Sequence, residues 1–83
     1  GMPRYPQELI NVAAPAAHAV EGHPRLQQAL AEARKAMGVD GRIVLRPSGT
    51  EPLLRVMVEG ADPDLVRLYA NRLATVAAEC ADA

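Results

Sequence analysis

The sequence predicts an α+β fold, a two-layer sandwich in which two helices cover one face of a small, mainly antiparallel sheet. Two observations lead to this class. Two short segments rich in Ile, Val and Leu flank a loop of turn-forming residues, which is typical of a β-hairpin. Two longer segments repeat apolar residues at intervals of three and four, as amphipathic helices do, and a further strand precedes the first of them. The expected order is β-α-β-β-α.

The composition is that of one globular domain without a nucleic-acid or membrane partner. Of the 83 residues, 49% are hydrophobic and 23% are charged, a balance that favours a packed core over disorder. The net charge of −1 gives no general attraction to nucleic acid or to an anionic membrane, so any anion site must be a small local cluster. Tyr5 and Tyr69 are the only aromatic residues, too few for the stacking surfaces of single-strand binders.

The first strand and first helix are delimited by prolines and glycines. "QELINVAA", residues 7–14, lies between two prolines and is expected to be a short strand. "PAAHAVEGHP", residues 15–24, has no regular period and is expected to be a surface connection with His18 and His23 exposed to solvent. A helix should then begin at Pro24 and end at Gly38. Its apolar positions are Leu26, Ala29, Leu30, Ala33 and Met37.

The hairpin and the second helix follow directly. "GRIVLR" (residues 41–46) and "LLRVMVEG" (residues 53–60) are the two strands, joined by a loop over residues 47–52. Asp62 has the chemistry of an N-cap and Pro63 suits the first helical position, so residues 62–64 indicate a helix start rather than a metal site. The expected apolar stripe of this helix is Leu65, Leu68, Tyr69, Leu73, Val76, Ala77 and Cys80.

Two arginines flank the loop "RPSGTEP", and their placement suggests a site for an anion. If Arg46 lies opposite Leu53, then Val44 lies opposite Arg55, and the two arginines are diagonal neighbours on the face that the helices leave uncovered. The other face is then entirely apolar, with Ile43, Leu45, Leu54, Val56 and Val58. Like charges at this separation repel, so a negatively charged group between them would be favourable.

The loop itself supplies further hydrogen-bond donors. Ser48 and Thr50 carry hydroxyls, and Gly49 permits a left-handed or closely approaching backbone. A phosphate, with close to two negative charges and three acceptor oxygens, matches these donors together with bidentate arginines. Spacing alone leaves open a second interpretation, in which the loop is a polar turn and Glu51 forms a surface ion pair with the arginines.

Cysteine and histidine usage argues against a metal site or a disulfide in this chain. Cys80 is the only cysteine, and two histidines without a third ligand do not make a zinc site. No apolar run reaches the length of about 20 residues that spans a bilayer, so a cytoplasmic protein is expected. Because Gly1 precedes Met2, residues 1–6 are expected to be a tag remnant and an interdomain linker, with the domain itself at residues 7–83.

The string "GRIVLRPSGTEPLLRVMVEG" resembles the C-terminal domain of the α-D-phosphohexomutases, most closely that of the bacterial phosphoglucosamine mutases. The similarity extends upstream through "YPQELINV" and downstream through "DPDLVRLYANRLA". It implies a fold like that of the TATA-box-binding protein and a fourth domain that holds the sugar phosphate not being transferred. Carried over residue by residue, that role falls on Arg46, Ser48, Gly49, Thr50 and Arg55.

The resemblance also implies what this chain lacks. In the family a phosphoserine in the first domain and a Mg²⁺ loop in the second carry the chemistry, so no catalytic residue, metal or cofactor is expected here. The parent enzyme would interconvert glucosamine 6-phosphate and glucosamine 1-phosphate for peptidoglycan precursor synthesis. The expected partners are the phosphosugar and the remaining domains. Two alternatives stay open: the same domain of a phosphomannomutase or phosphoglucomutase, and a non-enzymatic module whose open sheet face binds a protein.

Overall fold

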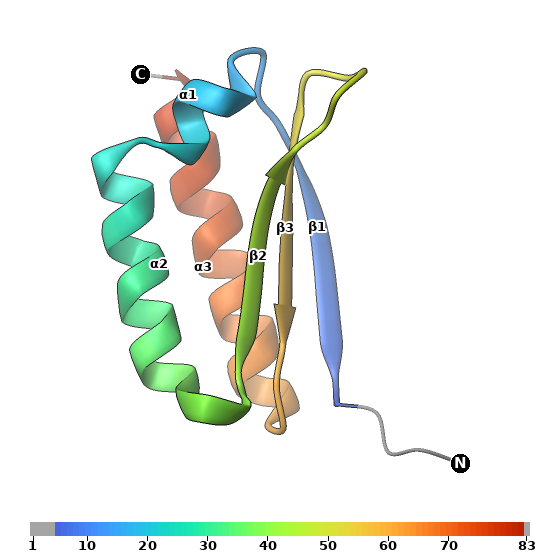
Figure 1. The fold of residues 1–83 in the computed structure, drawn as a ribbon, viewed down its shortest axis with the longest axis vertical. Helices are drawn as coiled ribbons and strands as arrows, with labels where there is room; N and C mark the ends of the chain where they lie inside the picture. The colour runs from blue at the N-terminus through green and yellow to red at the C-terminus, as the bar shows by residue number, and fades with distance from the viewer. Residues whose placement is uncertain (1–4, 83) are drawn as a thin grey trace.

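The computed structural model describes residues 5–82 and has two layers, with all helices on one side of a sheet (Figure 1). Residues 1–4, which belong to the expected tag remnant and linker, lie outside the described residues. The elements in chain order are β1 (Gln7–Ala13), α1 (Ala17–Glu21), α2 (Pro24–Met37), the 3-10 turn η1 (Gly38–Asp40), β2 (Arg42–Pro47), β3 (Leu53–Glu59) and α3 (Pro63–Asp82). The predicted α+β two-layer class is confirmed.

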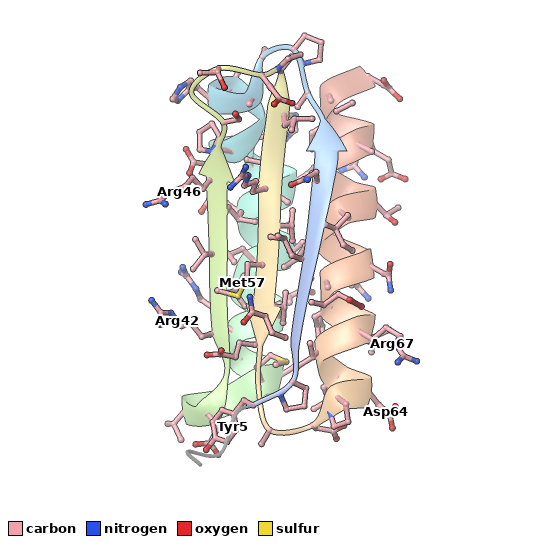
Figure 2. All side chains as sticks on the ribbon, turned by 90° about the vertical axis from the view of Figure 1, so that its right-hand side faces the viewer. Tyr5, Arg42, Arg46, Met57, Asp64 and Arg67 are labelled. Atoms are coloured by element: carbon pink, nitrogen blue, oxygen red, sulfur yellow. The ribbon has the colours of Figure 1, made fainter. Side chains whose placement is uncertain are left out.

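The sheet has three antiparallel strands in the order β1-β3-β2, so the last strand of the sequence lies in the middle. Residues paired across strands share a face, and the face alternates along each strand. The row formed by Val12, Leu54 and Pro47 points toward the helices, and so does every second row from there along the sheet. The intervening rows, which contain both arginines of the loop region, point to the open side, the side that Figure 2 presents.

The core lies between the sheet and the three helices. Its largest fully buried side chains are Leu26, Leu54, Leu73, Val56 and Val58. They come from α2, α3 and β3; α3 packs directly against the central strand, and α2 packs on α3 and on β2. Burying each such side chain contributes about 1.5–3 kcal/mol to folding, and β3, which carries Arg55, is therefore the best anchored strand.

The ends of both long helices follow the sequence signals. The Asp62 carboxylate accepts hydrogen bonds from the backbone N–H groups of Asp64 at 2.9 Å and Leu65 at 3.4 Å, which confirms the predicted N-cap of α3. Gly38 ends α2 with φ of 73°, and its N–H donates to the carbonyl of Arg34. A left-handed residue at this position favours glycine because it has no Cβ.

The connection predicted over residues 15–24 is wrong in one respect, because it contains the short helix α1. Ala17 and Val20 are buried one turn apart, so packing against the core holds five residues in a helix too short to show a period in the sequence. His23 is not a free loop residue either. Its Nδ1 accepts a hydrogen bond from the Arg25 N–H at 3.1 Å and caps α2.

The predicted apolar stripe of α3 is also partly wrong. Leu73, Ala77 and Cys80 are buried as expected, but Leu68 is 55% exposed. Val66 and Ala70 take its place in the core. The buried residues of α3 follow one another at spacings of four and three and so share one helix face, and Leu68 lies on the opposite side of the helix.

Candidate anion-binding site

Arg46 and Arg55 lie directly opposite each other on β2 and β3, on the open face of the sheet. The sequence-based register, with Arg46 opposite Leu53, is wrong by two residues. The hairpin closes one step later, where the Ser48 N–H donates to the Leu53 carbonyl at 2.9 Å. A shift of two residues leaves every side chain on its predicted face, and it brings the arginines from diagonal to direct neighbours.

Within residues 5–82 neither arginine has a carboxylate partner. The ion pairs of that region join Arg25 to Glu79 at 2.7 Å and Arg72 to Glu32 at 3.9 Å, all on the helices. The expected alternative, an ion pair between Glu51 and the arginines, is therefore not formed in this structure. Both guanidinium-bearing residues are exposed, and Arg46 extends outward past the edge of β2 (Figure 2).

The loop between the strands is fixed by its own hydrogen bonds. The Ser48 hydroxyl oxygen accepts from the N–H groups of Thr50 at 3.4 Å and Glu51 at 3.2 Å. The Ala14 N–H donates to the Pro52 carbonyl at 2.8 Å, which ties the loop to the end of β1. Because the Ser48 oxygen accepts these bonds, its own O–H remains available as a donor to a ligand.

Gly49 does not adopt the left-handed backbone that the sequence allowed. Gly38 is the one residue with a positive φ in the part of the chain that the structure describes. A Cβ at Gly49 would meet no atom within 4 Å, so no contact inside this chain requires glycine there. The residue is exposed at the tip of the loop, with Thr50 exposed beside it.

Within residues 5–82, Arg46 and Arg55 are the one pair of positively charged residues that lie directly opposite each other on this sheet face. Arg42, four residues before Arg46 on β2, lies opposite Glu59, so a carboxylate rather than a second cation is its cross-strand neighbour, although the two form no ion pair within 4 Å. The described residues contain no group of three or more His, Cys, Asp or Glu side chains that could hold a metal ion. Two hollows of about 300 and 360 Å³ lie among the helices and beside Leu45, away from the loop.

One neighbour of this site was missed by the sequence reasoning. Asn11 on β1 lies opposite Arg55, so it belongs to the same row of the open face as both arginines. Its alternation within β1 was visible in the sequence. The pairing of β1 with β3 was not, because those strands are separated by two helices and a hairpin strand.

Comparison with known proteins assigns the domain. Residues 9–76 match the model of the family described as "Phosphoglucomutase/phosphomannomutase, C-terminal domain". The chain belongs to this family. As a phosphohexomutase C-terminal domain it is 51% identical over 74 residues to a phosphoglucosamine mutase of Methylococcus capsulatus, and 53% identical over 70 residues to one of Azoarcus sp.. These matches cover 89% and 84% of the chain but 17% and 16% of the relatives, so the chain spans about one sixth of their length.

Solved structures of phosphohexomutases contain the same fold. An N-acetylphosphoglucosamine mutase of Aspergillus fumigatus matches 93% of the chain with a TM-score of 0.79 at 24% identity. A second structure of that enzyme, in complex with GlcNAc-6P and magnesium, matches with a TM-score of 0.75 at 25% identity. In each case the chain covers 16% of the larger protein. No helix within residues 5–82 is long and apolar enough to cross a membrane.

Proposed function

We propose that this domain holds the non-transferred phosphate of the sugar in a phosphoglucosamine mutase, which interconverts glucosamine 6-phosphate and glucosamine 1-phosphate. The observation that supports this role most directly is that Arg46 lies opposite Arg55 and that neither forms an ion pair with a carboxylate of residues 5–82. A phosphate dianion between the two guanidiniums would replace a repulsion by two charge-assisted contacts. Ser48, Gly49 and Thr50 would add hydroxyl and backbone donors from the loop.

The form of the site suits a reaction in which either of two phosphates must be held. A phosphate is a nearly symmetric anion, and donors placed around it bind it without regard to the rest of the sugar. The open space at Gly49 would let the anion approach the backbone closely. The domain would thus contribute positioning, and the phosphoryl transfer would take place on residues of the remaining domains.

The magnesium and the other partners of the reaction belong to the parent protein in this proposal. The relative crystallised with GlcNAc-6P also contains magnesium, whereas residues 5–82 contain no cluster that could ligate a metal. The remaining domains would supply the metal, the phosphoryl group and the sugar contacts. We place the reaction in the cytoplasm, since phosphorylated sugars are charged and do not cross a bilayer unaided.

An NMR titration tests the phosphate site. We expect phosphate, and glucosamine 6-phosphate after it, to shift the amide signals of Gly49 and Thr50 with a Kd of about 1 mM, because a few exposed charge-assisted contacts must offset the cost of association. Arg46→Ala should abolish these shifts. Arg42→Ala is the matched control, since it removes the same charge from the same strand and face, but at a position opposite Glu59 and away from the loop. Loop signals that do not respond at 50 mM phosphate would overturn the proposal.

The family model also covers phosphoglucomutases and phosphomannomutases, so the sugar is a separate question. The phosphoglucosamine relatives favour glucosamine phosphate. Assaying the full-length parent against the glucosamine, glucose and mannose phosphates would decide among the three. A preference for glucose or mannose phosphate would leave the phosphate site standing and change the substrate.

A further inference from the structure

Asn11 lies in the middle of β1, in register with the two arginines. Its Cα partner on β3 is Arg55, and the partner of Arg55 on β2 is Arg46. Residues paired in this way share a face, so the three side chains form one row across the whole width of the sheet. With strands about 4.8 Å apart, Asn11 lies one strand from Arg55 and about 10 Å from Arg46.

The fold gives no reason of its own for an asparagine here. Asn is depleted in strands, and Asn11 sits between two helix-facing residues, Ile10 and Val12. Its side chain is exposed and makes no hydrogen bond within the described residues 5–82. The other asparagine, Asn71, does have a structural bond, since its amide donates to the Arg67 carbonyl at 2.9 Å.

The position of Asn11 relative to the loop is fixed by the pairing of β1 with β3 and by a hydrogen bond between the end of β1 and the loop. β1 pairs with β3 over its full length, and its end is tied to the loop by the bond from Ala14 to Pro52. An amide on this row can accept a hydrogen bond from the Arg55 guanidinium through its carbonyl and still donate through its nitrogen. A carboxylate at the same place would instead neutralise Arg55 and repel an incoming anion.

We propose that Asn11 is a third side-chain donor of the anion site, with its amide nitrogen donating to an oxygen of a phosphate held beside Arg55. This inference rests on the proposed phosphate-binding function and extends the site from the hairpin to β1. The site then consists of one residue from each of the three strands, and the loop at the end of the hairpin lies beside this row. The amide is an uncharged hydrogen-bond donor, so it adds a contact to the phosphate without adding a third cation that would repel the two arginines.

The side-chain NH₂ signals give a direct reading, since the chain has only two asparagines. In a titration with inorganic phosphate, the Asn11 NH₂ signals should shift and saturate with the same Kd as the Gly49 amide. The Asn71 NH₂ signals, on α3, are the internal control and should not move.

Substitutions provide the second reading. Asn11→Ala should weaken phosphate binding about fivefold to tenfold, the effect of losing one ordinary hydrogen bond at an exposed position. Asn11→Asp should weaken it more, because the new charge pairs with Arg55. Gln7→Glu makes the same change of charge on the same strand and face, about 13 Å further along, and should alter the Kd by less than about twofold because ions screen charge over about 8–10 Å.

The outcomes separate this inference from the function on which it rests. If phosphate shifts Gly49 and Thr50 while the Asn11 signals stay still and Asn11→Ala binds as tightly as the unaltered chain, Asn11 is not a donor and the hairpin site stands alone. If no loop signal responds, both proposals fail together. Because Asn11 is exposed, unfolding of the variants is not expected, and their amide spectra without phosphate check this.

Discussion

Arg46→Gln should make the domain slightly more stable in the absence of phosphate. Arg46 and Arg55 are opposed across two strands, and Cα atoms in such pairs lie about 4.5–5.5 Å apart. Taking about 8 Å as the separation of the two exposed guanidiniums, their repulsion in water is about 0.5 kcal/mol. Removing it should raise the free energy of unfolding by that amount, or the melting temperature by about 2–4 °C for a domain of this size.

The assay is thermal and urea unfolding in a buffer without phosphate, at about 10 mM and about 500 mM NaCl. Arg42→Gln is the control, because Arg42 faces Glu59 and loses an attraction. It should lower the free energy of unfolding by about 0.2–1 kcal/mol, the range for opposite-charge pairs across strands. High salt should shrink both differences, since the Debye length falls below the separation of the charges.

Phosphate should reverse the order of stability. With a Kd of about 1 mM, 20 mM phosphate stabilises the unaltered domain by about 1.8 kcal/mol through binding to the folded state alone. The same phosphate concentration should add little to the free energy of unfolding of Arg46→Gln, because this variant binds phosphate weakly. A loss of stability in Arg46→Gln at low salt, or an equal gain from phosphate in both proteins, would show that the two charges do not oppose each other across a shared site.

Substitutions at three further positions test the surroundings of the site. Leu54→Ala, at a fully buried position of β3 beneath the arginines, should cost about 2–5 kcal/mol in urea unfolding, and a cost below about 1 kcal/mol would contradict the packing described. Asp62→Ala should cost about 1 kcal/mol by loss of the α3 N-cap, with Asp62→Asn retaining most of it; equal losses in both would rule out the cap. Gly49→Ala should leave the melting temperature within about 2 °C, because a Cβ meets no atom within 4 Å, yet weaken phosphate binding measured by NMR; unchanged binding would argue against close approach of the anion.

The elements with strong local signals were predictable from the sequence. Asp62 and Pro63 located the start of α3, Gly38 located the end of α2, and the two Val- and Ile-rich segments located the hairpin. Each of these signals is chemical and local, so no knowledge of the rest of the chain was needed. The alternation of period two also placed the arginines on the open face, because that result survives a register shift of two residues.

The features that were missed depend on contacts distant in sequence. The helix α1 exists because Ala17 and Val20 pack on the core, and Leu68 is exposed because the sheet is covered by the α3 face that carries Val66 and Ala70. The direct pairing of Arg46 with Arg55 depends on where the loop closes. The place of Asn11 beside Arg55 depends on the strand order β1-β3-β2, which no local pattern in β1 encodes.

The central claim is that two arginines on neighbouring strands share one anion. The Nε–H signals of Arg46 and Arg55, followed during a phosphate titration at constant ionic strength, test this most directly. We expect both signals to shift and to saturate along one binding curve, while the Arg42 signal, on the same face, stays in place. Two different saturation points, or movement of all three signals in proportion to added salt, would contradict a shared phosphate site.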